Sequence, residues 1–163
     1  MQVVPITERI YVEFNHITSS EFDIQTHINN LIKQKKGTCS KSLGYILDTG
    51  DILSIHDNTI LRSSPHVVFN ITYTATLLKP NIGDVYEAKI EEILPSRVRC
   101  KYKIINIMIP SIYLNGLSYN KDTKTFSNKL KSCIKEKDVV SVRIEKINYS
   151  SGNYLCIGKL INL

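Results

Sequence analysis

The sequence has no tryptophan, and its 163 residues include only 7 glycines and 5 prolines. It contains no Gly-rich phosphate loop, no G-x-S-x-G and no H-E-x-x-H, so the common motifs for nucleotide binding, serine hydrolysis and zinc proteolysis are missing. No apolar run reaches the length of a membrane span, and the first eight residues lack the apolar region of a signal peptide. We therefore expect an intracellular protein that is not an enzyme and does not enter a membrane.

Cysteine is sparse and scattered. The four cysteines form no C-x-x-C, and the four histidines supply no ligand at metal spacing. We expect reduced thiols in a reducing compartment, with no metal and no cofactor. The cysteines are Cys39, Cys100, Cys133 and Cys156.

The remaining composition is that of a globular protein with a basic surplus. Hydrophobic residues make up 42% of the chain, charged residues 22%, and the mean hydropathy is -0.10. The 21 Lys and Arg exceed the 15 Asp and Glu by six, which gives a pI near 9.1. Such a surplus favours an anionic partner, most commonly nucleic acid, although it also serves solubility alone.

The first half reads as a small α+β module. Alternating apolar residues predict a strand over 9–14, and a helix follows, with Ser20 and Asp23 spaced as a capping box and Gly37 as its left-handed stop. Two short β runs, 44–47 and 52–55, flank Gly50 and predict a hairpin. The longest alternation, 67–78, predicts a strand with one buried face.

A domain boundary is expected at the proline–glycine corner that begins with Pro80. Beyond it, five predicted strands (85–94, 97–104, 106–109, 139–147 and 154–160) suit a small barrel of the OB kind. The expected fold class is therefore α+β: a tip domain over 1–80, with one helix on an antiparallel sheet, and a five-stranded OB-fold barrel over 81–163.

Cations occupy every second position of the second barrel strand. In an extended strand they share one face, about 6.5 to 7 Å apart, and can meet successive phosphates of single-stranded RNA. The alternative is an exposed strand that Lys and Arg keep from aggregating. If four phosphates are neutralised, a plot of the logarithm of the RNA-binding constant against the logarithm of salt concentration should have a slope of about -3, which we call the log–log salt slope. The cations are Arg97, Arg99, Lys101 and Lys103.

A second basic region mixes lysines with the aromatic residues Tyr119 and Phe126. Stacking and charge together could contact RNA there. We favour a solvated loop, because exposed lysine-rich loops need no ligand to explain them. The lysines are Lys121, Lys124, Lys129, Lys131, Lys135 and Lys137.

Catalysis finds little support in the sequence. Glu91 and Glu92 are adjacent, so on a strand they point to opposite faces rather than converging as an acid–base pair.

A series of short motifs in order resembles the RNA polymerase stalk subunit family, which has archaeal members and, in eukaryotes, RNA polymerase II subunit seven. Each motif is common alone, and the order makes the match specific. The motifs are Gly37-Thr38-Cys39, Gly44-Tyr45-Ile46-Leu47, Val68-Phe69-Asn70-Ile71-Thr72-Tyr73-Thr74-Ala75, Lys79-Pro80 and Gly83-Asp84-Val85, with weaker matches at Leu117-Ser118-Tyr119-Asn120 and Ile157-Gly158-Lys159-Leu160.

The resemblance implies a non-catalytic subunit of a DNA-directed RNA polymerase. It implies a tip domain that docks on the polymerase core near the base of the clamp, a small helical partner subunit forming a heterodimer, and a barrel that contacts nascent single-stranded RNA. The docking residues expected from it are Gly44, Tyr45, Ile46, Leu47, Lys79 and Pro80. For RNA binding we expect residues of the cationic strand and of the second basic region, namely Arg97, Arg99, Lys101, Lys103, Tyr119, Lys121 and Lys124.

The sequence departs from the family at two places in the barrel. Ala88 replaces a glycine of the first strand, and Ser96-Arg97 replaces a glycine–aromatic pair that offers a stacking surface. Binding here would thus rely more on charge. Two alternatives stay open: a free-standing OB-fold RNA-binding module, and an assembly scaffold without RNA contact.

The resemblance also sets the expected location. A cellular eukaryotic member works in the nucleus with its polymerase, and a viral one in the virion or host cytoplasm. The abundance of Ile, Asn and Lys suits an AT-rich genome, so a large DNA virus with its own polymerase is a plausible source.

Overall fold

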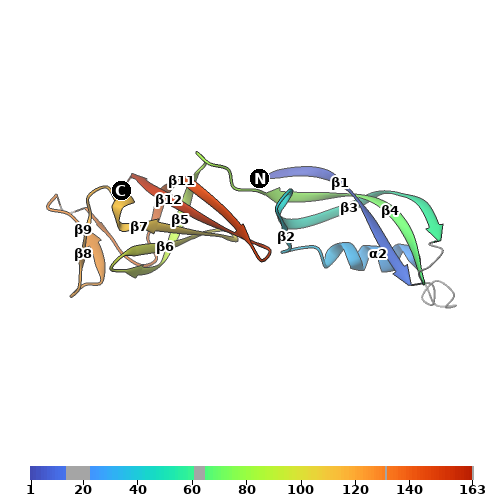
Figure 1. The fold of residues 1–163 in the computed structure, drawn as a ribbon, viewed down its shortest axis with the longest axis horizontal. Helices are drawn as coiled ribbons and strands as arrows, with labels where there is room; N and C mark the ends of the chain where they lie inside the picture. Colours follow the sequence, from blue (N-terminus) through green and yellow to red (C-terminus); the bar gives the residue numbers. More distant parts are fainter. Residues whose placement is uncertain (14–22, 61–64, 131, 163) are drawn as a thin grey trace. The chain divides into compact units, whose positions relative to one another are not determined.

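A computed structural model describes residues 1–13, 23–130 except 61–64, and 132–162. The chain divides into two compact units, Met1–Lys79 and Pro80–Leu163. Among the described residues, Figure 1 shows helix α2 and a sheet in the first unit, and strands almost throughout the second. No helix in these ranges is both long and apolar enough to cross a membrane.

In its described part, the first unit is an antiparallel sheet covered by a helix. Its strands are β1 (Gln2–Glu13), β2 (Cys39–Ser40), β3 (Gly44–Ile60) and β4 (His66–Leu78), in the order β1-β4-β3-β2. The helix α2 (Ile24–Lys33) buries Ile28 and Ile32 against the sheet. Alternate residues of β4 from Val67 to Ala75 enter the same core, as the period-two pattern predicted.

The ends of α2 follow from side-chain and backbone chemistry. Asp23 is the N-cap, and its carboxylate accepts hydrogen bonds from Gln25 N (3.0 Å) and Thr26 Oγ1 (2.9 Å). Ser20, the other half of the predicted capping box, lies outside the described residues. Gly37 has the predicted left-handed backbone, with φ +84°, but it is not the C-cap of α2. The C-cap is Gln34, and Gly37 ends the turn that follows the helix.

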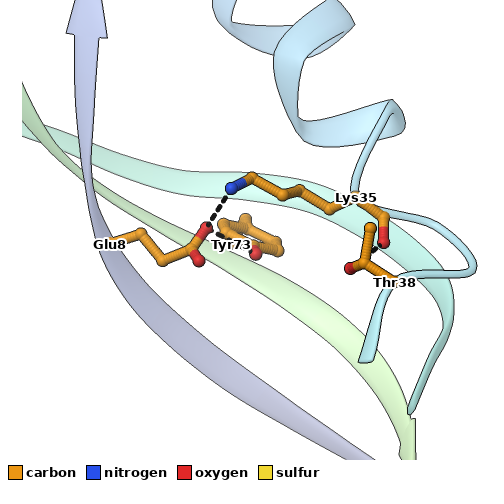
Figure 2. A network of polar contacts seen from close by, with 4 residues as sticks. All are labelled: Glu8, Lys35, Thr38 and Tyr73. Carbon is orange, nitrogen blue, oxygen red and sulfur yellow. Dashed lines mark hydrogen bonds and ion pairs between the residues drawn. The ribbon is translucent and has the colours of Figure 1, made fainter. Parts of the chain in front are cut away.

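A buried phenol links three segments of this unit (Figure 2). Tyr73 Oη donates a hydrogen bond to Glu8 Oε2 at 2.8 Å, and Lys35 Nζ lies 3.8 Å from the same oxygen. Burial, followed by this hydrogen bond, raises the pKa of Tyr73 above its ordinary value. The contacts fasten β1 and β4 to the segment that follows α2.

Two strand predictions in this unit were wrong. The predicted hairpin over 44–55 is one continuous strand, because β4 is long enough to pair with both halves of β3 across several register shifts. Gly50 does not form a turn. It allows β3 to pass close to Thr74 of β4, because a Cβ at Gly50 would lie 2.0 Å from Thr74 Oγ1. The first strand also starts earlier than predicted, since β1 lies at the sheet edge, where Pro5 is tolerated.

The second unit is a closed five-stranded barrel, as predicted. The strands are β5 (Val85–Leu94), β6 (Arg97–Tyr102), β7 (Ile105–Pro110), β11 (Val139–Ser150) and β12 (Asn153–Asn162), in the cyclic order β11-β12-β7-β6-β5. β7 and β12 pair in parallel and the other neighbours are antiparallel, an arrangement consistent with an OB-like barrel. Gly158 allows β12 to pass close to β11, since a Cβ there would lie 2.2 Å from Val142 Cγ1.

The segment between β7 and β11 is structured, so its interpretation as a loop was wrong. It contains the short 3-10 helix η1 (Ser111–Tyr113) and the strands β8 (Ser118–Asn120), β9 (Thr125–Ser127) and β10 (Cys133–Ile134), which form a sheet in the order β10-β9-β8. Phe126 and Ile134 are each 1% exposed. These apolar residues give the segment a small core, which a solvated loop would lack.

Candidate nucleic-acid interface

The positive charge of the chain belongs to the barrel unit. Residues 80–163 hold 14 Lys and Arg against 8 Asp and Glu, a surplus of six. Residues 1–79 hold seven of each sign and are therefore neutral overall. The whole net charge of +6 thus comes from the unit that carries the barrel.

The outer face of β6 presents three of the four predicted cations. Arg97, Arg99 and Lys101 are exposed, while Val98 and Cys100 between them are buried inside the barrel at 0% and 2% exposure. Strand alternation produces this division, as the sequence predicted. Successive exposed cations are about 6.5 to 7 Å apart along the strand.

Lys103 does not continue this row, contrary to the prediction. β6 ends at Tyr102, and Lys103 has φ +51° in the turn to β7. Its Nζ lies 5.8 Å from the centre of the Tyr102 ring. The tight turn breaks the period-two alternation, so Lys103 leaves the line of Arg97, Arg99 and Lys101.

One of the three aligned cations is engaged by an acid. Arg99 donates a hydrogen bond from Nη1 to Glu92 Oε2 at 2.6 Å, and the two residues face each other across β6 and β5. Both side chains are substantially exposed, so the pair adds little to stability, but it offsets the charge that Arg99 offers to a ligand.

Glu91 and Glu92 occupy a β-bulge, and the prediction that they point to opposite faces was wrong. The register shifts between Ile90 and Glu92, which leaves Glu91 as an extra residue. Ile90 and Ile93 on either side are buried, so both carboxylates turn outward. Sequence alternation alone could not reveal the extra residue.

A hollow of about 320 Å³ lies on the barrel face formed by β5, β6, β7 and β12. Arg97, Arg99 and Glu91 contribute charged groups, whereas Met108 and Leu155 contribute apolar surface. On β7, Met108 lies opposite Arg99 of β6. Asn106 lies opposite Lys101 of β6 on one side and Leu155 of β12 on the other. The lining residues are Glu91, Arg97, Arg99, Cys100, Asn106, Ile107, Met108 and Leu155.

This face corresponds to the one that OB folds use for oligonucleotides. β6 and β7 are the second and third strands of the barrel, whose outer face and adjoining loops carry that function in OB folds. The sequence did not single out Asn106, Met108 or Leu155. The buried alternation of Ile105, Ile107 and Ile109 was the available signal, because it places the intervening residues of β7 outside.

The lining residues of the hollow include no aromatic side chain. Tyr86 and Tyr102 stack on each other with ring centres 4.5 Å apart, and both are half-buried. Burial and a hydrogen bond to Asp84 raise the pKa of Tyr86. Ala88 is fully buried in the barrel core. The hollow therefore offers charged groups, the Asn106 amide and apolar surface, and no aromatic stacking from its lining residues.

The other predicted RNA-binding residues lie on the β8–β9 hairpin and do not line the hollow. Lys121 and Lys124 are exposed in its turn, and Lys124 has φ +52°. Tyr119 is half-buried and packs on Phe126 with ring centres 5.5 Å apart. Of the other lysines predicted in this region, Lys131 lies outside the described residues.

The docking residues predicted within the first unit lie at one end of β3 and β4, and Pro80 begins the second unit. Gly44 approaches the Lys79 backbone closely, and Lys79 Nζ donates a hydrogen bond to Ser42 O at 3.3 Å. Tyr45 and Ile46 are 1% and 5% exposed, so their side chains are mainly structural in this chain. Of the remaining positions, Leu47 is half-buried, Lys79 is exposed and Pro80 is buried.

Metal chemistry has no evident site in the described parts of the chain, where no three His, Cys, Asp or Glu side chains converge. Burial, with a smaller contribution from the charge of Glu91, raises the pKa of Cys100 to about 12. Burial and the charge of Asp84 raise the pKa of Cys156 to about 11. Both thiols therefore stay protonated near neutral pH.

Comparison with family models gives no match. A curated protein, the DNA-directed RNA polymerase II subunit rpb7 of Dictyostelium discoideum, is 29% identical to this chain over 84 residues. The match covers 52% of this chain and 48% of the relative, so it spans about half the length of each. The similarity predicted from the ordered motifs is thereby confirmed: the chain resembles the RNA polymerase stalk subunit family.

Proposed function

We propose that the chain is a non-catalytic stalk subunit of a DNA-directed RNA polymerase. Its similarity to the polymerase II subunit of Dictyostelium discoideum carries this proposal. The combination of a neutral α+β unit with a basic OB-like barrel supports it. In this scheme the first unit anchors the subunit on the polymerase core, and the barrel contacts emerging RNA.

The proposed RNA contact is the outer face of β6 and β7. Arg97 and Lys101 are exposed cations on this face, while Arg99 is offset by Glu92. Single-stranded RNA lowers the log–log salt slope by about 0.7 per neutralised phosphate, so two or three contacts give a slope of about -1.4 to -2.1. The four-phosphate slope of about -3 is no longer expected, since Lys103 leaves the row.

The proposed anchor is the end of the first unit where Gly44 meets Lys79. The exposed Lys79 and the partly exposed Leu47 are the side chains that a polymerase core could contact there. Tyr45 and Ile46 are buried, so we assign them a packing role at that end rather than direct contact with the core. By family resemblance, we further propose a small helical partner and a nuclear location, or the virion or host cytoplasm if the source is a virus.

Co-purification tests the proposal most directly. The tagged chain, expressed in its source, should bring down the large polymerase subunits and one small helical protein. A chain that is recovered alone, in its source, under conditions that keep the polymerase intact would refute the stalk assignment. That result together with tight RNA binding would favour a free-standing RNA-binding module.

Salt titration tests the RNA contact separately. The double substitution Arg97→Gln and Lys101→Gln should flatten the salt slope by about 1.4, because two phosphate contacts are lost. A control with Lys33→Gln and Lys146→Gln removes the same charge from exposed positions outside the hollow. Equal slopes for the two variants would refute the proposed face, and polymerase co-purification without RNA binding would favour an assembly scaffold.

A further inference from the structure

We infer that the hollow on the barrel is a nucleobase site that selects guanine through Glu91. This inference rests on the proposed contact with single-stranded RNA and specifies its chemistry. The hollow combines a carboxylate, an amide and an apolar surface within one open depression of about 320 Å³. That size is at the small end of ligand sites, which range from about 300 to 1,000 Å³.

The lining of the hollow suits a base better than a phosphate. Met108 and Leu155 offer apolar surface, and Leu155 is 47% exposed although it is a large hydrophobic residue. The Glu91 carboxylate repels a phosphate, and Glu92 already takes up a hydrogen bond of Arg99. Phosphates are therefore expected along Arg97 and Lys101, and the base they carry is expected to lie on the apolar surface between them.

The β-bulge explains why a carboxylate is present at this position. On a regular strand, the residue after the inward-facing Ile90 would turn outward and the next would turn inward. The extra residue instead leaves both Glu91 and Glu92 outside. Glu92 pairs with Arg99, and Glu91 lines the hollow. The two acids on this face have different roles: Glu92 offsets the charge of Arg99, and Glu91 faces the hollow, where a ligand would bind.

The chemistry of a carboxylate favours one base. An ionised carboxylate only accepts hydrogen bonds, and it has two oxygens with which to do so. Guanine alone among the four RNA bases presents two adjacent donors, N1–H and the 2-amino group, on its Watson–Crick edge. Adenine and cytosine place a ring-nitrogen acceptor next to their amino group, and uracil places its single N–H between two carbonyls.

Asn106 completes the recognition at the other side of the hollow. Its exposed side chain can donate a hydrogen bond through its amide group, which matches the carbonyl O6 of guanine. Unpaired RNA bases are commonly read through such edge contacts, and a good bidentate pair discriminates strongly against a wrong base. We therefore expect guanine to be preferred over adenine by roughly tenfold.

The experiment measures RNA affinity of the full chain by fluorescence anisotropy. The probes are oligouridylates of equal length whose central residue is guanosine, adenosine, cytidine or inosine. Guanosine should bind roughly tenfold more tightly than adenosine, and inosine should lie between them because it lacks the 2-amino group. In the Glu91→Gln variant, the guanosine-to-adenosine ratio should fall to about one, while affinity for plain oligouridylate stays equal or rises as a negative charge is removed.

A matched control is Glu136→Gln, which removes the same charge from an exposed turn outside the hollow. It should leave the guanosine preference unchanged. Salt-dependent RNA binding with no preference for guanosine, or a preference that survives Glu91→Gln, would overturn the guanine site and leave the proposed RNA contact intact. The absence of salt-dependent RNA binding in the wild-type chain would overturn both.

Discussion

Two glycines of the first unit offer a direct test of its backbone geometry. Gly37 and Gly44 both have positive φ, +84° and +80°. A Cβ at Gly37 would meet nothing within 4 Å, whereas one at Gly44 would lie 2.6 Å from Leu78 O and 2.7 Å from Lys79 Cβ. Alanine at Gly37 therefore measures the backbone strain alone, and alanine at Gly44 adds the steric overlap to it.

The expected magnitudes differ clearly. Left-handed backbone costs an L residue roughly 1–2 kcal/mol, and the more restricted unfolded chain returns about 0.4–1 kcal/mol of this. Gly37→Ala should thus lower the free energy of unfolding by about 1 kcal/mol. Gly44→Ala should cost about 3 kcal/mol, because overlap with a packed backbone typically adds about 1–3 kcal/mol.

Hydrogen exchange on the full chain is the suitable assay, because it reports the opening free energy of each unit separately. Amides of β3 and β4 should lose about three times as much protection free energy in Gly44→Ala as in Gly37→Ala, and barrel amides should be unaffected. Equal losses in the two variants would show that the close approach of Gly44 to Lys79 is not real.

Two further predictions concern buried groups. Tyr73→Phe should lower the stability of the first unit by about 1 kcal/mol at neutral pH, because the bond to Glu8 is lost. The pKa of Tyr73 is raised in the folded state, so its contribution to the free energy of unfolding is present below the ordinary pKa of 10.0 and is lost as pH rises above that value. Urea denaturation should therefore show a smaller loss of stability at alkaline pH in Tyr73→Phe than in the wild-type chain. An equal loss in both proteins would contradict the assignment. In maleimide labelling near pH 8, the exposed Cys133 should react first, whereas Cys100 and Cys156, with pKa values raised to about 12 and about 11, should react only on unfolding. Peptide mapping that finds Cys100 labelled early would refute the burial of this thiol.

The barrel could be predicted because its strands carry their own periodicity. In β6, Val98 and Cys100 alternate with Arg97 and Arg99, so the inward and outward sets follow from the sequence alone. The helix could also be predicted, since Ile28 and Ile32 share one face, and the left-handed Gly37 ends the turn that follows it. These are local rules, in which side-chain type and spacing decide the structure.

The errors arose where a neighbouring strand overrides a local pattern. Gly50 resembles a turn in the sequence, yet β4 pairs on both sides of it and requires the missing side chain. Lys103 continues a cationic alternation, yet the return of the chain into β7 places it in a turn. In each case the conformation of the residue is set by pairing with a neighbouring strand and not by the local sequence pattern.

The candidate site shows the same division. The sequence identified Arg97, Arg99 and Lys101 as an exposed cationic face, because alternation is local. It missed the hollow, which draws residues from four strands that only barrel closure brings together. It also misjudged Glu91, because a bulge depends on the register between β5 and β6.

Residue type, spacing and order are enough to predict helix α2, the main strands of both units, the basic surplus and the likeness to the stalk subunit family. The folded chain is needed to see which cations stay in line, which one Glu92 offsets, and that a carboxylate lines the same hollow as Met108 and Leu155. Strand register and barrel closure are fixed by hydrogen bonds between distant segments, and a shift of one residue changes which side chains face a ligand.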